Sequence, residues 1–307
     1  LLMVFCPAAA AGADFSFVPR ISVGTAYTDN VFLTPSDEES DFVTFVSPGF
    51  DLDLTGRNSA LGITYDPAFI NYTRFPERTY WQHRASLDGW AEVAKGTRIE
   101  LTNNFLYTQD PFQEGDFQQA DFQEADTTVR QGREPYTTNT TTLGVVNRFG
   151  PEDVVDLSYA HFFLENEDPT IEDSSYRQPN LRLTYWFSPN RYAAEIQAAY
   201  TISDFEVTED FEDLDSRFRL SKRFGRRLDA YFEYGYVRFE YLEEGEDYQV
   251  HSPVLGFILA EGPETRFEAS IGYFVRDNDL SDDDDGIVGS FDMAYAYATE
   301  RTVNVNG

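Results

Sequence analysis

Arginine recurs on alternate positions in one short stretch, residues 216–223, and this spacing is the first candidate for chemistry in the sequence. Arg217, Arg219 and Arg223 fall on the same side of an extended chain, because successive side chains of a β-strand point to opposite faces. Three positive charges on one face can contact an anionic or polar solute. We therefore predict that these arginines form a solute-contacting patch.

The same alternation places other charged residues on one face of their strands. If that face lines a lumen, the predicted solute-contacting residues are Arg84, Arg182, Arg191, Arg217, Arg219, Arg223, Arg266, Glu195 and Glu233. Acidic and basic residues are nearly balanced on this face, so most of the net negative charge belongs to the loops. Mixed charge can set a transverse field that selects solutes in a pore. The other interpretation, which stays open, is a ladder of ion pairs that only fills the interior.

Catalytic chemistry has little support in the sequence. A hydrolase needs a nucleophile or a water-activating base close to a histidine or to paired carboxylates. The three histidines, His83, His161 and His251, all fall by parity on the apolar side of their strands. The sequence also contains no glycine-rich phosphate loop and no cofactor motif. We predict that the protein is not an enzyme and has no cofactor.

An acidic stretch at residues 277–286 offers oxygen ligands for Ca²⁺. The candidate ligands of this predicted extracellular loop are Asp279, Asp282, Asp283, Asp284 and Asp285. Their spacing matches no EF-hand loop, and a solvated negative surface explains the same residues. The calcium site is the weaker of the two interpretations.

The elements that position the arginines are amphipathic strands. Ser216–Tyr236 reads as a hairpin in which Gly225 supplies the turn and apolar residues alternate with charged ones. The pattern recurs in about 14 strands, which short turns and long acidic connections join in alternation, as is typical of a bacterial outer-membrane barrel. We predict an all-β, antiparallel up-and-down transmembrane β-barrel, with about 16 or more strands in the full-length protein. We also expect a β-bulge near Asp66–Pro67 and a turn at Arg301–Gly307.

Composition narrows the classes of protein further. The formal net charge is −31, which argues against nucleic acid and anionic membrane surfaces as partners. Aromatic residues make up 16% of the chain. Disordered acidic chains are poor in aromatic residues, so the negative charge of this chain does not indicate disorder. The mean hydropathy is −0.45, and no run of 18 or more apolar residues follows the N-terminus, so a helical membrane protein is excluded. A barrel is not excluded, because its strands turn only every second residue to lipid. A soluble β-sandwich also shows alternation, but the strand lengths and the alternating loop lengths favour the barrel.

The chain begins with apolar and small residues that resemble the end of a secretory signal. We expect residues 1–13 to be a residual signal peptide that includes Cys6, the only cysteine, and residues 14–307 to form the barrel. A mature chain without cysteine has no disulfide framework and no thiol nucleophile. The last residues lack a closing strand with a terminal aromatic, so we expect the full-length protein to continue beyond Gly307.

A family resemblance begins at Tyr27–Val31, where the Asp-Asn-Val tip of a loop is followed by Ser40–Val43 and by Val46–Phe50. This pattern resembles the N-terminal signature of β-barrel outer-membrane porins found with exosortase (PEP-CTERM) and exopolysaccharide loci. It covers residues 20–110 and includes no catalytic residue. The resemblance implies a channel of the bacterial outer membrane, in contact with lipid and lipopolysaccharide, that passes polysaccharide or other polar solutes. The competing hypothesis is an adhesive or structural barrel with a plugged lumen, whose acidic loops bind partners or cations.

Overall fold

The structure is a computed structural model that describes residues 14–32, 36–109, 134–188, 191–225, 227–243, 245–260, 265–298 and 301–306. The predicted signal peptide with Cys6, most of the long loop near 110–136 and Arg226 of the hairpin turn lie outside the described residues. None of the helices in this part of the chain is long and apolar enough to cross a membrane.

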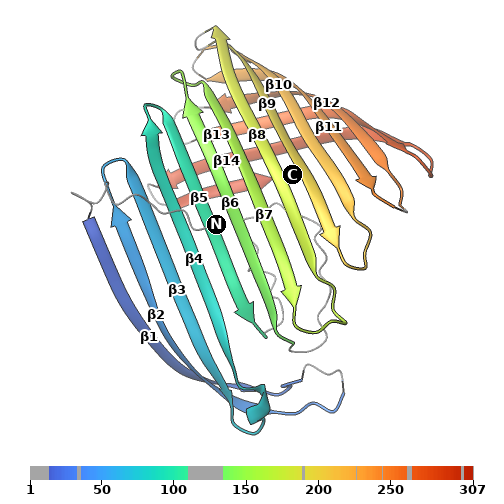
Figure 1. Cartoon of the computed structure of the whole chain (residues 1–307). Coiled ribbons are helices and arrows are strands. Elements are labelled where there is room, and N and C mark those ends of the chain that lie inside the picture. The colour runs from blue at the N-terminus through green and yellow to red at the C-terminus, as the bar shows by residue number, and fades with distance from the viewer. Residues whose placement is uncertain are drawn as a thin grey trace. The chain divides into compact units, whose positions relative to one another are not determined.

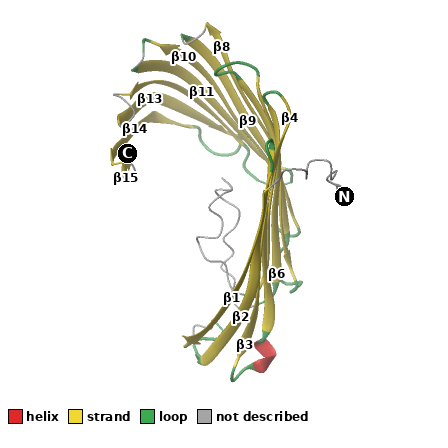
Figure 2. Ribbon diagram, turned by 90° about the vertical axis from the view of Figure 1, so that its left-hand side faces the viewer, coloured by secondary structure: helices red, strands yellow, loops and turns green. Residues whose placement is uncertain are grey.

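The described residues fold into fifteen strands that form one sheet in chain order (Figure 1). The strands are β1 Asp14–Thr28, β2 Asp41–Thr55, β3 Ser59–Tyr72, β4 Tyr80–Ala94, β5 Thr97–Thr108, β6 Tyr136–Arg148, β7 Val154–Asn166, β8 Ser174–Ser188, β9 Tyr192–Phe205, β10 Phe211–Arg223, β11 Leu228–Tyr241, β12 Tyr248–Ala260, β13 Thr265–Asn278, β14 Asp284–Ala298 and β15 Arg301–Asn306. The 3-10 helix η2, Pro76–Arg78, lies between β3 and β4 and is the helix drawn in red in Figure 2. This arrangement confirms the predicted antiparallel up-and-down fold.

The predicted hairpin is β10 with β11, and its register brings Arg219 opposite Glu233 and Arg223 opposite Asp229. Gly225 has a φ of +122°, a conformation that a residue with a Cβ rarely adopts, which explains the glycine in the turn. The Phe224 N–H donates a hydrogen bond to the Leu228 carbonyl across this turn, at 2.7 Å.

Three local expectations are wrong. Arg301–Asn306 is a strand paired with β14 and not a turn, because pairing with a neighbour overrides the weak apolar pattern of so short a segment. Asp284 and Asp285 begin β14, so the predicted acidic loop is shorter than expected. The register between β2 and β3 is the same on both sides of Asp66–Pro67, so no bulge is present there.

The chain divides into two compact units, which are described separately. The first contains residues 1–91, 100–142 and 162–174, and the second contains residues 92–99, 143–161 and 175–307. In the first unit, β1 to β4 pair with their neighbours in antiparallel order, and the register does not shift within any of these pairs. In the second unit, β9 to β14 do the same, and this stretch holds most of the predicted solute-contacting residues.

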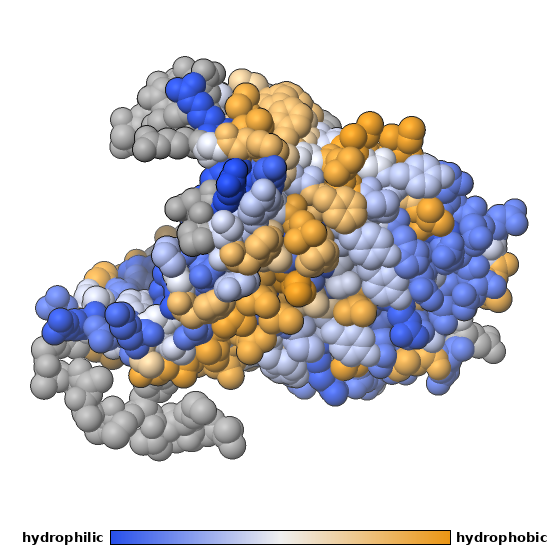
Figure 3. All heavy atoms as spheres, turned by 90° about the horizontal axis from the view of Figure 1, so that it is seen from above, coloured by the Kyte–Doolittle hydropathy of each residue, from blue (hydrophilic) through white to orange (hydrophobic). Residues whose placement is uncertain are grey.

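The two faces of the paired strands differ in chemistry. The face that carries Ile21 in β1, Leu255 in β12 and Ile271 in β13 is called the apolar face. The opposite face of the same strands is called the polar face. These three residues are 73%, 62% and 63% exposed, and hydrophobic residues lie open on the surface in Figure 3. A soluble sandwich buries such a face in its core, whereas a transmembrane barrel turns it toward lipid. The exposure of the apolar face therefore favours the membrane barrel.

Candidate functional site

On the polar face of β10 and β11, two arginines form ion pairs with the same glutamate. The Arg219 guanidinium lies 2.6 Å from the Glu233 carboxylate, and the Arg217 guanidinium lies 3.5 Å from the same carboxylate. Arg219 and Glu233 are direct cross-strand partners, which explains the shorter distance. The Glu233 side chain is only 14% exposed, so one shielded negative charge is shared by two positive charges.

Further contacts connect this ion pair to residues of β11 and β13. The Arg219 guanidinium lies over the Tyr231 ring, at 4.2 Å from its centroid, and the Tyr231 hydroxyl donates a hydrogen bond to the Glu268 carboxylate at 3.0 Å. Glu268 in turn pairs with Arg266 at 2.8 Å. We call the connected set Arg217, Arg219, Tyr231, Glu233, Arg266 and Glu268 the charge network. It brings together four of the predicted residues and adds Tyr231 and Glu268.

Arg223 has other partners, closer to the short turns. Its guanidinium pairs with Glu152 at 3.2 Å and with Asp229 at 3.4 Å, and it lies over the Trp186 ring at 4.3 Å from the centroid. Arg223 therefore ties the β10–β11 hairpin to the β6–β7 turn and to β8. It shares a face with Arg217 and Arg219 but not their partners.

The remaining predicted residues lie on β4, on β8 and at the start of β9. Glu195 is opposite Arg219 in the register of β9 and β10 and accepts hydrogen bonds from Thr184 and Gln197. Arg191 lies over the neighbouring Tyr192 ring at 5.9 Å, and Arg182 in β8 is exposed. Arg84 in β4 belongs to the first unit, opposite Asp66 of β3.

The first unit carries an apolar cluster that the sequence did not predict. Val31 of the β1–β2 connection is fully buried against Ile70 and Tyr72 of β3 and Tyr80 of β4. Ile70 and Tyr80 are cross-strand partners on the polar face, at the end of the strands that carries the longer loops. The β1–β2 connection therefore folds over the polar face and is anchored there by hydrophobic contact.

Asp41 fixes the same end of the first unit by hydrogen bonding. Its side chain is 2% exposed and accepts hydrogen bonds from the backbone N–H groups of Phe42 at 2.7 Å and Arg74 at 2.9 Å. The amide of Phe75 lies at 3.4 Å from the same carboxylate. Val31 and Asp41 are both part of the resemblance noted above, so the structure gives these signature residues a structural role.

A family comparison agrees with this arrangement. Residues 9–162, which are half of the chain, match the family model described as "Putative beta-barrel porin 2". The chain belongs to this family. It is therefore an outer-membrane β-barrel porin, and family membership confirms both the predicted location and the absence of an enzymatic role. No curated protein sequence matches the chain.

Several solved structures align with this porin over most of its length. A "Bacterial polysaccharide outer membrane secretin" is 15% identical, with a TM-score of 0.45, over 94% of this chain and 99% of that chain. A loop-deletion mutant of an outer membrane protein of Vibrio cholerae is 10% identical, with a TM-score of 0.46, over 96% and 92%. An "Anion-selective porin from Comamonas acidovorans" is 9% identical, with a TM-score of 0.38, over 96% and 98%.

Two of the three histidines lie in aromatic clusters on the apolar face of the porin. The His83 Nδ1 is 2.8 Å from the Tyr65 hydroxyl, and the His251 Nδ1 is 2.6 Å from the Tyr234 hydroxyl. The rings of Tyr65 and His83 are parallel within 5°. Aromatic and polar rings of this kind suit the boundary between lipid and water.

The acidic loop between β13 and β14 shows no metal-binding arrangement. Asp283 accepts a hydrogen bond from the Asn278 N–H at 3.1 Å, and Asp285 accepts one from the Tyr273 hydroxyl. The Asp279 N–H donates to the Asp247 carbonyl at 3.0 Å. In the described residues, no group of three or more His, Cys, Asp or Glu side chains could hold a metal ion. The calcium site stays an untested prediction.

Proposed function

We propose that this porin is a conduit for polysaccharide or other polar solutes and that its polar face is the solute-contacting wall. The observation that carries the proposal is the charge network of the second unit, which lies on the face opposite the exposed apolar residues. Its arginines keep part of their donors open to water, since the Arg217 and Arg266 side chains are 46% and 57% exposed. A wall of paired but accessible charges can exchange hydrogen bonds with a polar solute without holding it tightly.

The polysaccharide part of the proposal is supported by the resemblance of residues 20–110 to porins of exosortase and exopolysaccharide loci. The charge network is compatible with it, because the hydroxyl groups of a sugar can bond to both carboxylates and guanidinium groups. We extend the solute-contacting role to Arg84, Arg182, Arg191, Arg223 and Glu195, which share the predicted register.

Conductance and sugar uptake of the purified protein test the proposal. The protein, folded into phospholipid vesicles and checked by heat-modifiable gel migration, should conduct ions in planar bilayers. Vesicles that contain it should also swell in an uncharged oligosaccharide. The double variant R217Q/R219Q should alter ion selectivity, because it removes two charges of the network. The control is R238Q, since Arg238 lies on the apolar register and pairs with Glu240.

The competing hypothesis predicts another result. A plugged adhesive barrel should migrate as a folded barrel on the gel yet neither conduct nor admit sugar. The apolar cluster around Val31, which lies on the polar face of the first unit, is the feature that favours this alternative. Absence of conductance from the correctly folded protein would overturn the channel hypothesis and favour the plugged barrel.

A further inference from the structure

A row of aromatic rings crosses the polar face of the second unit near the long-loop ends of its strands. The Phe211 and Phe239 rings stack with centroids 4.8 Å apart, and the Phe239 and Tyr248 rings stack at 5.2 Å, parallel within 5°. Phe205 extends the row, at 6.1 Å from Phe211. We call Phe205, Phe211, Phe239 and Tyr248 the aromatic row. Each residue comes from a different strand, β9 to β12.

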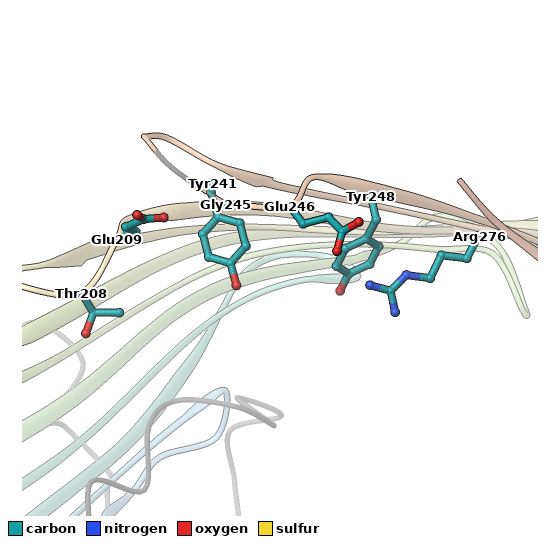
Figure 4. Close-up of a pocket in the computed structure, with 7 residues that line it drawn as sticks. All are labelled: Thr208, Glu209, Tyr241, Gly245, Glu246, Tyr248 and Arg276. Carbon is teal, nitrogen blue, oxygen red and sulfur yellow. The ribbon is translucent and has the colours of Figure 1, made fainter. Parts of the chain in front are cut away.

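The row ends at a hollow of about 450 Å³ (Figure 4). Its lining includes Tyr241, Glu246, Tyr248 and Arg276. The Arg276 guanidinium lies over the Tyr248 ring, at 4.0 Å from the centroid. This volume is within the range of about 300–1,000 Å³ that small-molecule sites have in proteins.

The two ends of the row differ in exposure. On the β8 side, the Tyr176 ring meets Phe205 edge to face at 5.5 Å and is almost completely buried. On the β11 and β12 side, Tyr241 is exposed and Tyr248 is half-buried. Packing between strands explains the aromatic residues at the buried end of the row. It does not explain the aromatic rings that line an open hollow at the other end.

The chemistry of the hollow fits a sugar. The faces of a pyranose ring carry C–H groups that stack on aromatic rings, while its hydroxyl groups bond to charged and phenolic side chains. Tyr241 and Tyr248 supply the rings, and Glu246 and Arg276 supply an acceptor and a donor. Glu209 adds a second carboxylate to the lining, so the negative charges outnumber the arginine and disfavour a polyanion.

We propose that this hollow and the adjoining rings form a binding site for the sugar units of an uncharged polysaccharide. The inference rests on the proposed function, since the aromatic row lies on the face that we assign to the solute. It goes further in naming the residues that hold the sugar and the charge class of the sugar chain. The two carboxylates disfavour uronic-acid polymers.

Calorimetric titration of the folded protein in detergent micelles tests the site without any need for conductance. The probes are maltohexaose, which is uncharged, and a hexamer of galacturonate, which is anionic. Maltohexaose should bind, and the galacturonate hexamer should bind at least about tenfold more weakly. The variants Y248A and Y241A should each weaken maltohexaose binding about tenfold, because each removes one stacking ring.

The matched control is Y273A. Tyr273 is an exposed tyrosine of β13, three residues from Arg276, but it lies on the apolar register. Its loss should leave maltohexaose binding unchanged. Heat-modifiable migration shows that every variant is folded before it is titrated.

The outcomes separate this site from the channel. Binding that is lost in Y248A, in a protein that neither conducts nor admits sugar, supports the site and overturns the proposed function. Conductance without binding, or binding that survives in both Y241A and Y248A, overturns the site and leaves the channel intact. Preference for the galacturonate hexamer would overturn the assigned charge class.

Discussion

Arg20 of β1 reaches over β2 and pairs with Asp66 of β3. Its guanidinium donates two hydrogen bonds to the Asp66 carboxylate, at 2.9 and 3.1 Å, and it also lies 3.0 Å from Asp51. The strand between them passes under this pair at Gly49, which is the cross-strand partner of Arg20. Arg20 can therefore reach Asp66, two strands away, because Gly49 between them has no side chain.

Replacement of Gly49 by alanine should break this arrangement. A Cβ at that position would lie 2.2 Å from the Asp66 Oδ1 and 3.0 Å from the Tyr65 carbonyl oxygen. The Asp66 carboxylate must move away, so G49A should destabilise the folded protein by about 1 kcal/mol. Urea unfolding in phospholipid vesicles measures this change.

Gly62 provides the matched control. It lies on the same face in β3, but a Cβ there would be 3.4 Å from the Asp53 Oδ1, an ordinary contact. G62A should leave stability within about 0.5 kcal/mol of the parent. Equal losses in both variants would show that backbone effects of glycine, and not the Arg20–Asp66 pair, determine the result.

Asp41 is expected to be more important for stability than any exposed ion pair of the first unit. Alanine at this position leaves the partly buried N–H groups of Phe42, Arg74 and Phe75 without their carboxylate. Loss of a charged acceptor of this kind costs about 1–3 kcal/mol. D41A should therefore lower the temperature at which the folded gel band disappears. E39A is the control, because the Glu39 side chain pairs with Arg74 in an exposed position and the loss of this pair should have little effect.

Alternation in the sequence correctly predicted the strands and the face on which most charged residues lie, because strand parity needs only local information. The interaction partners of these residues could not be predicted from alternation. The pairing of Arg219 with Glu233 depends on the stagger of β10 and β11, which the turn at Gly225 sets. Asp41 and Arg74 are 33 residues apart in the chain, so no local pattern shows that one binds the amide of the other.

The errors have a similar origin. The run Asp284–Asp285 has low β-propensity and predicts a loop, yet both residues pair with β13. The aromatic row was also missed, because its rings fall on the register otherwise occupied by charges. A signal was available, since Phe205, Phe211, Phe239 and Tyr248 each lie at the long-loop end of a strand.

The contact between Glu246 and Ser281 should make the loops at the long-loop end sensitive to acid. Glu246 accepts a hydrogen bond from the Ser281 N–H at 2.6 Å. The hydrogen bond of the Ser281 side chain, with that of its N–H, lowers the pKa of Glu246 below its usual value. The folded pKa is lower than the unfolded one, so the contact stabilises the folded loops above the ordinary glutamate range and is lost as the pH falls through the folded pKa.

A carbon-13 titration of the Glu246 carboxyl group measures this effect. The variant S281A should raise the pKa of Glu246 toward its usual value, because it removes the hydroxyl group. S270A is the control, since the Ser270 hydroxyl bonds to Ser290 and not to Glu246. An unchanged titration in S281A would contradict the assigned cause.

Neutralisation of Glu233 should shift the ion selectivity of the channel toward anions. E233Q leaves the guanidinium groups of Arg217 and Arg219 without their shared counter-charge. A net positive wall attracts anions and repels cations, so the anion-to-cation permeability ratio should rise severalfold. The reversal potential across a bilayer in a potassium chloride gradient measures this ratio.

The control for this prediction is E240Q in the same strand. Glu240 also pairs with an arginine, Arg238, but it lies on the apolar register and not on the polar face. Both variants remove one negative charge, so a field that depended only on the total charge would shift selectivity equally in the two. A shift in E233Q alone places Glu233 beside the path of the ions. A shift in neither, in channels that still conduct, would mean that the charge network fills the interior without contact with the permeating solute.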